Sequence, residues 1–232
     1  MRNIFNKIYH KLVKLRWQPI RVFCVHHVSN VFDDCTMHRG DWLQIDTFKH
    51  AIIEQQQAGY TFISIQDAYY HLCTDKFRTR KYAVLTADDG WASLHCILPW
   101  LDEQKIPISL FINPSYLDGK HFRERETEQY LTKTEVEHMY RHYPLVTIGS
   151  HGWEHIDAMN QSESEFLDNV NRSIEFLEKI PNFVPFYAYA WGTHTRATDE
   201  LLIKRHITPV LMDGMKNYCK SNYIHRELFV CQ

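Results

Sequence analysis

YAVLTADDG, residues 82–90, is the stretch from which the fold and the chemistry of this chain are best predicted. The apolar run from Tyr82 stops at two adjacent carboxylates, Asp88 and Asp89, and Gly90 follows them. Such a run predicts a buried strand that delivers acids to the rim of a core, with glycine permitting a tight exit. Neighbouring carboxylates repel each other unless a metal or a hydrogen-bond donor holds them. An Asp-Gly turn at a strand end is the simpler alternative, and this stretch alone leaves both open.

The composition is that of an ordinary globular protein. The chain has 232 residues, of which 44% are hydrophobic and 23% charged, so it can bury a sizeable core and is not disordered. A net charge of −2 gives no steering toward nucleic acid. Its six cysteines form no C-x-x-C pair, which excludes a zinc ribbon, and reduced thiols are expected.

The first residues have a basic, amphipathic pattern. Six lysines and arginines precede the first acid, Asp33, and apolar residues recur at helical spacing within residues 1–17. Such a helix can lie on an anionic membrane surface or pack on the domain itself. The sequence shows no apolar signal-peptide region with a small-residue cleavage site. We expect an N-terminal segment at 1–19, a catalytic domain at 20–232, and a cytoplasmic protein with peripheral contact at the inner membrane face as an open alternative.

Strand and helix patterns alternate through most of the chain. Strands are predicted at 20–25, 60–65, 82–85, 108–112, 145–148, 185–191 and 208–212, with 228–231 as the candidate closing strand. Helices are predicted at 46–58, 66–72, 93–104, 132–142, 162–177 and 198–206, two of them headed by capping boxes, Thr132 with Glu135 and Ser162 with Glu165. The alternation implies a parallel sheet wrapped by helices, either a barrel or a doubly wound sheet. No G-x-G-x-x-G follows any strand, so a nucleotide site is not expected.

Polar residues occupy the exits of three predicted strands: His26-His27, Asp88-Asp89 and His151. In a barrel these all point to the same C-terminal face, where active sites lie. His155 follows His151 by four residues, a spacing that presents two imidazoles on one face of a helix, although fifteen histidines make a chance match easy. Two histidines and one carboxylate, with positions left for water, form a catalytic rather than a structural metal set.

These stretches resemble the motifs of the polysaccharide deacetylases, the NodB-like carbohydrate esterases. Residues 86–90, TADDG, are similar to T-F-D-D-G, and residues 150–155, SHGWEH, to H-[S/T]-x-x-H. Upstream, residues 25–28, VHHV, are similar to Y-H-x-V, and residues 48–65 to the helix and strand that follow it. Residues 187–192, YAYAWG, resemble the F-A-Y-P-Y-G motif of the poly-N-acetylglucosamine deacetylase branch. The resemblance runs from about residue 20 to 230.

The resemblance implies an α/β fold, a distorted (β/α)7 barrel in a single domain, which removes acetyl groups from amino sugars with a divalent metal, commonly zinc. By position, Asp89, His151 and His155 would bind the metal and Asp88 would be the general base. The metal would polarise the acetyl carbonyl and acidify its water, and Asp88 would take the proton. The backbone N–H of Trp191 would help to hold the oxyanion.

The chain departs from the family pattern at the third motif, where the arginine that usually orients the base is replaced by Ala188. Arg226, in Ile224-His225-Arg226, resembles the L-P-R motif near the family's end and is predicted to supply the missing cation. Arg196 is the weaker substitute.

The family's general-acid histidine has no certain counterpart. His225 is the candidate by position, with His194 and His206 as rivals, and each can equally be a surface histidine. Four residues are predicted to bind substrate: Tyr187, Tyr189, Trp191 and His26. The three aromatic side chains could stack on a sugar, although alternate residues of one strand are as often core.

We therefore expect a metal-dependent deacetylase that hydrolyses the acetamide of an N-acetylated sugar in a polysaccharide or a glycan-assembly intermediate. The missing signal peptide favours a cytoplasmic or membrane-surface intermediate over an extracellular polymer. One alternative is an O-acetyl esterase on a carbohydrate. Another is a catalytically inactive metal-containing glycan-binding protein, which the absent third-motif arginine favours and the intact Asp-Asp-His-His set opposes. The expected partner is an N-acetylated carbohydrate, without nucleic acid.

Overall fold

The computed structural model describes residues 18–30, 42–75, 78–117, 129–219 and 221–229. The predictions for residues 1–17 and for the loop at 33–41 lie outside these ranges, as does most of the irregular stretch 114–131. No helix in the described part of the chain is both long and apolar enough to cross a membrane.

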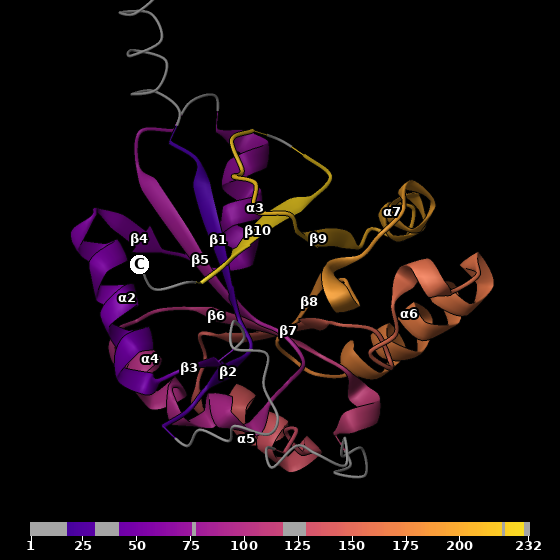
Figure 1. The fold of residues 1–232 in the computed structure, drawn as a ribbon, viewed down its shortest axis with the longest axis horizontal. Coiled ribbons are helices and arrows are strands. Elements are labelled where there is room, and N and C mark those ends of the chain that lie inside the picture. The colour runs from indigo at the N-terminus through magenta and orange to yellow at the C-terminus, as the bar shows by residue number, and fades with distance from the viewer. Residues whose placement is uncertain (1–17, 31–41, 76–77, 118–128, 220, 230–232) are drawn as a thin grey trace, which may run out of the picture.

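Parallel strands close into a barrel (Figure 1). The strands are β1 (Ile20–Val25), β5 (Lys81–Ala87), β6 (Ile108–Ile112), β7 (Val146–Ser150), β8 (Phe183–Ala188), β9 (Thr208–Met212) and β10 (Ile224–Leu228). β1 pairs with β5 on one side and with β10 on the other, which closes the ring. β4 (Tyr60–Phe62) pairs with the first half of β5, while β2 (His27–Val28) and β3 (Trp42–Leu43) form a small separate ribbon. The predicted (β/α)7 barrel is confirmed, and the doubly wound alternative is excluded.

Helices surround the barrel: α2 (Ile45–Gln57), α3 (Ile65–Thr74), α4 (Leu98–Glu103), α5 (Lys133–His142), α6 (Glu163–Leu177) and α7 (Arg196–Ile203). Both predicted capping boxes form, at the starts of α5 and α6. The helix predicted over 93–104 is split into a 3₁₀ turn, η1 (Ala92–Cys96), and α4. Pro99 explains the break, because it fits the first turn of a new helix but cannot donate a hydrogen bond inside a continuous one.

Alternate residues of each strand face the inside and the outside of the barrel. An inner apolar cluster includes Val22, Val84, Phe111 and Ile224. Their neighbours along the strands pack in a second cluster with the helices. The interior is therefore filled with side chains, and only the ends of the strands can carry a reaction site.

The closing strand differs from the prediction of residues 228–231. β10 spans Ile224–Leu228, and residues 230–232 lie outside the described ranges. Its sequence, IHREL, was not recognised as a buried strand because charged residues fill it. Ile224 and Arg226 nevertheless face the interior and are buried, so an arginine occupies a core position of this strand.

Candidate metal and acid–base site

Three candidate metal ligands meet at the carboxyl ends of β5 and β7. Nε2 of His151 lies 3.1 Å from Oδ1 of Asp89, and Nε2 of His155 lies 3.2 Å from the same oxygen. One donor atom from each residue falls within 4.8 Å of the other two. The structure thus brings together the three residues that the sequence analysis assigned to the metal.

The segment that carries the two histidines is a loop, so the helical premise for their spacing is wrong. The chain turns at Gly152, whose φ of 89° suits glycine. Asn113, at the end of β6, fixes this turn because its Nδ2 donates to the carbonyl oxygens of His151 (2.7 Å) and Gly152 (3.1 Å). The imidazoles converge through this support, which the H-x-x-x-H spacing did not reveal.

The donor set fits a divalent cation. Nδ1 of His151 donates to the carbonyl oxygen of Ala188 at 2.8 Å, so Nε2 is the nitrogen that carries the lone pair when the ring is neutral. That lone pair faces Oδ1 of Asp89, a buried atom with no hydrogen-bond partner among the described residues. Two electron-rich atoms at this distance repel each other unless positive charge lies between them. Two imidazoles and one carboxylate oxygen are the donors that a catalytic Zn²⁺ takes.

The electrostatics of the cluster favour positive charge as well. Burial alone would raise the pKa of Asp89, but its close contacts with the imidazoles of His151 and His155 hold it well below its usual range. Burial alone would lower the pKa of His151, and the charges of Asp88 and Asp89 raise it on balance. Asp89 therefore stays ionised in a field that attracts a cation.

Asp88 is held by a guanidinium from the last strand. Nη1 of Arg226 lies 2.6 Å from Oδ1 of Asp88, and Nη2 lies 2.8 Å from Oδ2, a bidentate pair between side chains that are both buried. Burial alone would raise the pKa of Asp88, but the charge of Arg226, the charge of His151 and the hydrogen bonds from Arg226 together outweigh it, and the pKa is lowered. The contact predicted between these two residues is present, and it keeps Asp88 ionised.

A second set of donor atoms lies behind this pair: Cys24, His26 and Asp88. Nη1 of Arg226 is 3.4 Å from Sγ of Cys24 and 3.3 Å from Oγ1 of Thr86. Burial raises the pKa of the Cys24 thiol well above its usual value, so the thiol is neutral. Because the guanidinium already supplies the positive charge here, this set is not a metal site. Cys24 and Thr86 were not predicted as site residues, although the alternation of inward-facing residues in β1 and β5 places them beside Asp88.

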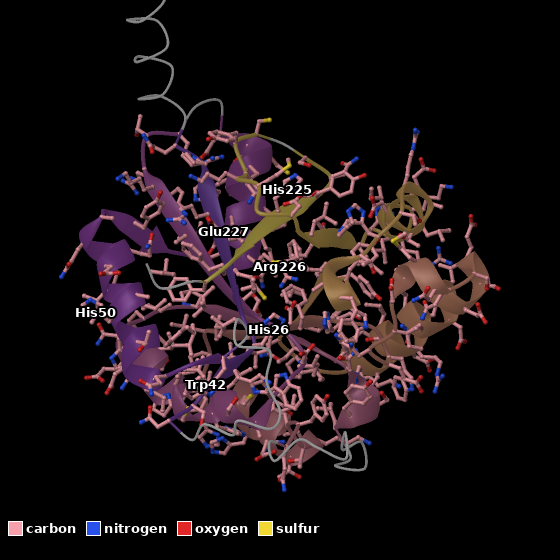
Figure 2. The ribbon with its side chains drawn as sticks, in the orientation of Figure 1. His26, Trp42, His50, His225, Arg226 and Glu227 are labelled. Carbon is pink, nitrogen blue, oxygen red and sulfur yellow. The ribbon has the colours of Figure 1, made fainter. Side chains whose placement is uncertain are left out.

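The general-acid prediction for His225 is contradicted by the structure. His225 precedes the inward-facing Arg226 on β10 and therefore faces the opposite side of the strand. Its Nδ1 lies 2.7 Å from Oδ2 of Asp213. Figure 2 labels His225 and Arg226 as neighbours on β10. His26, by contrast, follows β1 and has a ring nitrogen within 4.8 Å of an Asp88 oxygen. It is the histidine that the structure brings to the predicted base.

The other candidates are occupied elsewhere. Nδ1 of His194 pairs with the buried Asp199 at 3.0 Å. His206 is exposed and stands just before β9, at the opposite end of the barrel from the ligand cluster. Arg196 pairs with Glu200 on the exposed side of α7.

The prediction that Tyr187 and Tyr189 stack on a sugar is wrong. Both are 1% exposed, and both rings pack against Phe166. The hydroxyl of Tyr189 donates to Asp199, so this tyrosine is a core residue with its polar end satisfied. Trp191 differs, because the chain leaves β8 and turns at this residue with φ of 62°. Its side chain is 58% exposed, and its ring centre lies 5.0 Å from that of His155.

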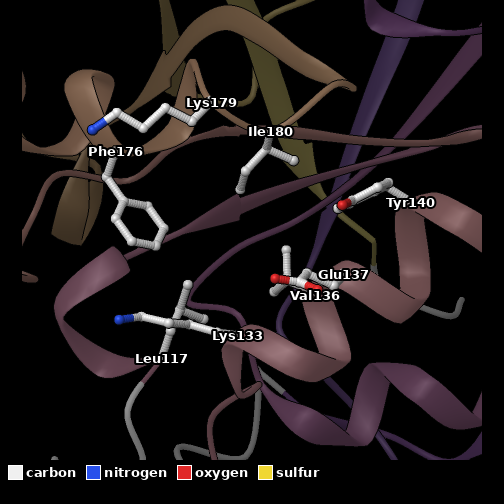
Figure 3. A pocket seen from close by; sticks show the side chains of 8 residues that line it. All are labelled: Leu117, Lys133, Val136, Glu137, Tyr140, Phe176, Lys179 and Ile180. Carbon is white, nitrogen blue, oxygen red and sulfur yellow. The ribbon is translucent and has the colours of Figure 1, made fainter.

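A cavity of about 270 Å³ lies on the outer side of the barrel between α5 and α6 (Figure 3). Apolar side chains, a tyrosine, a glutamate and two lysines line it: Leu117, Lys133, Val136, Glu137, Tyr140, Phe176, Lys179 and Ile180. None of these belongs to the ligand cluster, so the cavity is no part of this site.

A comparison with models of protein families finds a match to one family. The family model described as "Polysaccharide deacetylase" matches residues 75–210, more than half of the chain. The matched range begins before β5 and ends within β9, so it includes Asp88, Asp89, His151 and His155. No curated protein sequence matches.

Solved structures share the fold. IcaB from Ammonifex degensii is 20% identical, with a TM-score of 0.77 and coverage of 92% of each chain. A Streptococcus pyogenes deacetylase, PplD in complex with acetate, is 16% identical with a TM-score of 0.74, over 91% of this chain and 92% of its own. A de-N-acetylase from Aggregatibacter actinomycetemcomitans is 15% identical with a TM-score of 0.72, over 90% and 94%. At sequence identities of 15–20%, these similarities establish the fold and nothing about the activity of this chain.

Proposed function

This chain belongs to the polysaccharide deacetylase family, and from that premise we propose that it hydrolyses the acetamide of an N-acetylated sugar with the help of a divalent metal, most favourably zinc. One observation carries the proposal. Of two adjacent carboxylates, Asp89 faces two imidazole nitrogens while Asp88 is held apart by Arg226. The two acids thus have separate environments, which lets one bind a cation and the other accept a proton.

When bound, the cation would polarise the acetyl carbonyl and acidify a water molecule. Asp88 accepts a proton from the attacking water. Its two hydrogen bonds with Arg226 use one lone pair on each oxygen, so a second lone pair remains for the proton. The water oxygen bonds to the acetyl carbon, the C–N bond breaks, and the nitrogen leaves with a proton as the free amine. The backbone N–H of Trp191 is proposed to stabilise the oxyanion.

We assign to His26 the role of donating a proton to the leaving nitrogen. Its ring nitrogen lies near Asp88, and its side chain is partly exposed, so it can contact both the reaction centre and a bound sugar. Trp191 is proposed to stack on the sugar, because its indole is exposed beside His155. Support for a substrate at the inner membrane surface comes from the basic pattern of residues 1–17.

His26→Gln should lower kcat for acetate release about 10²-fold, because the leaving nitrogen then departs without an acid. Bound zinc should be unchanged, since His26 is not in the ligand cluster. His225→Gln is the matched control and should keep the wild-type rate, since His225 lies outside the barrel. A slow His225→Gln beside a normal His26→Gln would reverse the assignment.

Metal removal tests the function itself. Protein stripped with a chelator should release no acetate from N-acetylglucosamine oligomers, and one equivalent of Zn²⁺ should restore the activity. The same preparations should be assayed on O-acetylated sugars. Release from the O-acetylated sugars alone would favour the esterase. Zinc binding without release from any acetylated sugar would favour a glycan-binding protein.

A further inference from the structure

The two carboxylate oxygens of Asp89 have different partners. Oδ1 faces the histidines, whereas Oδ2 accepts a hydrogen bond from Nε1 of Trp91 at 3.0 Å. We propose that Trp91 is a positioning residue that makes Asp89 a one-oxygen metal ligand. This inference rests on the metal site of the proposed function and assigns a role to a residue that the motif comparison did not single out.

The indole N–H of Trp91 donates to the Asp89 oxygen that does not face the histidines, and the backbone of Asp89 limits where this carboxylate can point. Asp89 has a φ of 69°, in the left-handed region that few residues other than glycine adopt, so its side chain leaves the backbone in an unusual direction. A hydrogen bond to an ionised oxygen is among the stronger ones, and it keeps that oxygen turned away from the histidines. With Oδ2 engaged, Oδ1 alone remains for a cation.

Trp91 is itself packed against two other rings. Its ring centre lies 4.2 Å from that of His27 and 4.2 Å from that of Tyr130, the latter nearly parallel at 19°. The backbone is tied as well: the N–H of Ala92 donates to the carbonyl of Gln129 (2.7 Å), and that of Leu131 to the carbonyl of Gly90 (2.8 Å). The indole is 4% exposed and cannot swing away without breaking this packing.

The ring contacts of Trp91 extend through Tyr130 and Tyr116 to His155, the second proposed metal ligand. The ring of Tyr130 lies 4.8 Å from that of Tyr116, and the hydroxyl of Tyr116 accepts the backbone N–H of His155 at 3.2 Å. We call His27, Trp91, Tyr130 and Tyr116 the aromatic column. It contacts the side chain of Asp89 at one point and the backbone of His155 at another. Two ligands from distant parts of the chain are therefore held in one packed frame, which is what support of a metal ligand by its neighbours requires.

Trp91→Phe tests the inference, because it keeps a ring in the column and removes the N–H. Metal-free protein should bind Zn²⁺ about 10–100-fold more weakly than the wild type in competition with a chromophoric chelator. The absorption spectrum of bound Co²⁺ should also change, since Oδ2 becomes free to join the coordination. Trp100→Phe is the matched control. Trp100 is in α4 and packs on Phe48 of α2, away from the ligand cluster, so this variant should match the wild type in both measurements.

Each outcome bears on the inference. Wild-type zinc affinity and an unchanged Co²⁺ spectrum in Trp91→Phe would overturn it, as would an equal loss in Trp100→Phe. If the wild type itself binds no zinc, the proposed function and this inference fall together. If the wild type binds zinc and Trp91→Phe binds it with the same affinity, this inference fails while the proposed function stands. Should Trp91→Phe not fold, a benzothiophene in place of the Trp91 indole removes the N–H and keeps both rings, and the same two measurements apply.

Discussion

Asp88→Asn should keep its zinc and release acetate about 10³–10⁴-fold more slowly than the wild type. An amide is a far weaker proton acceptor than the ionised carboxylate that Arg226 maintains. The substitution also turns an NH₂ group toward one of the guanidinium N–H groups, which replaces a hydrogen bond by a donor–donor contact. The measurements are kcat for acetate release and bound zinc on the same protein sample.

Asp213→Asn is the control for this substitution. Asp213 pairs with His225 outside the barrel, so the variant should retain the wild-type rate. Acetate release by Asp88→Asn at the wild-type rate would remove Asp88 as the base. Loss of zinc together with activity would instead assign Asp88 to the metal.

Arg226→Met should be the most destabilising of these variants, lowering the free energy of unfolding by about 3–5 kcal/mol, because it leaves the Asp88 carboxylate buried without its partner. Acetate release should fall at least about 10²-fold, since the base loses its orientation. Arg226→Lys should recover part of the stability but little of the rate, because an ammonium cannot reproduce the bidentate contact. Denaturant unfolding and kcat measure the two effects.

The double variant Asp88→Asn/Arg226→Met separates stability from catalysis. Its free energy of unfolding should lie above that of Arg226→Met, because no unpaired carboxylate remains, while acetate release stays lost. Arg21→Met is the control, since Arg21 pairs with Glu227 at a partly exposed position and should cost about 1 kcal/mol at most. Equal unfolding energies for Arg226→Met and Arg21→Met would contradict the buried pair's role.

The barrel was predictable because hydrophobic periodicity and polar strand exits are local properties. The run that ends at Asp88 and Asp89 marked both a strand and a site, and the capping boxes of α5 and α6 marked two helix starts. Faces were harder to predict. Both sides of a barrel strand are buried, so the sequence could not show that Tyr187 in β8 and Tyr189 just after it are core residues.

Contacts between residues far apart in the sequence could not be predicted either. The orientation of His225 depends on where β10 begins, and its charged sequence hid that start. Trp91 stands two residues after Asp89 and could have been noticed, but its partner Tyr130 comes from a stretch without periodicity, 114–131. Contacts of this kind follow from the assembled fold rather than from any short pattern.

The Asp88–Arg226 pair also sets an order of events. The proposed base leaves β5, in the first half of the chain, whereas its counter-ion comes from β10, the strand that completes the ring. Until β10 joins, the ring is open between β1 and β9, and Asp88 has no counter-ion. Joining of the last strand therefore completes the ring and supplies the counter-ion of Asp88, so we expect acetate release only from chains in which β10 has paired.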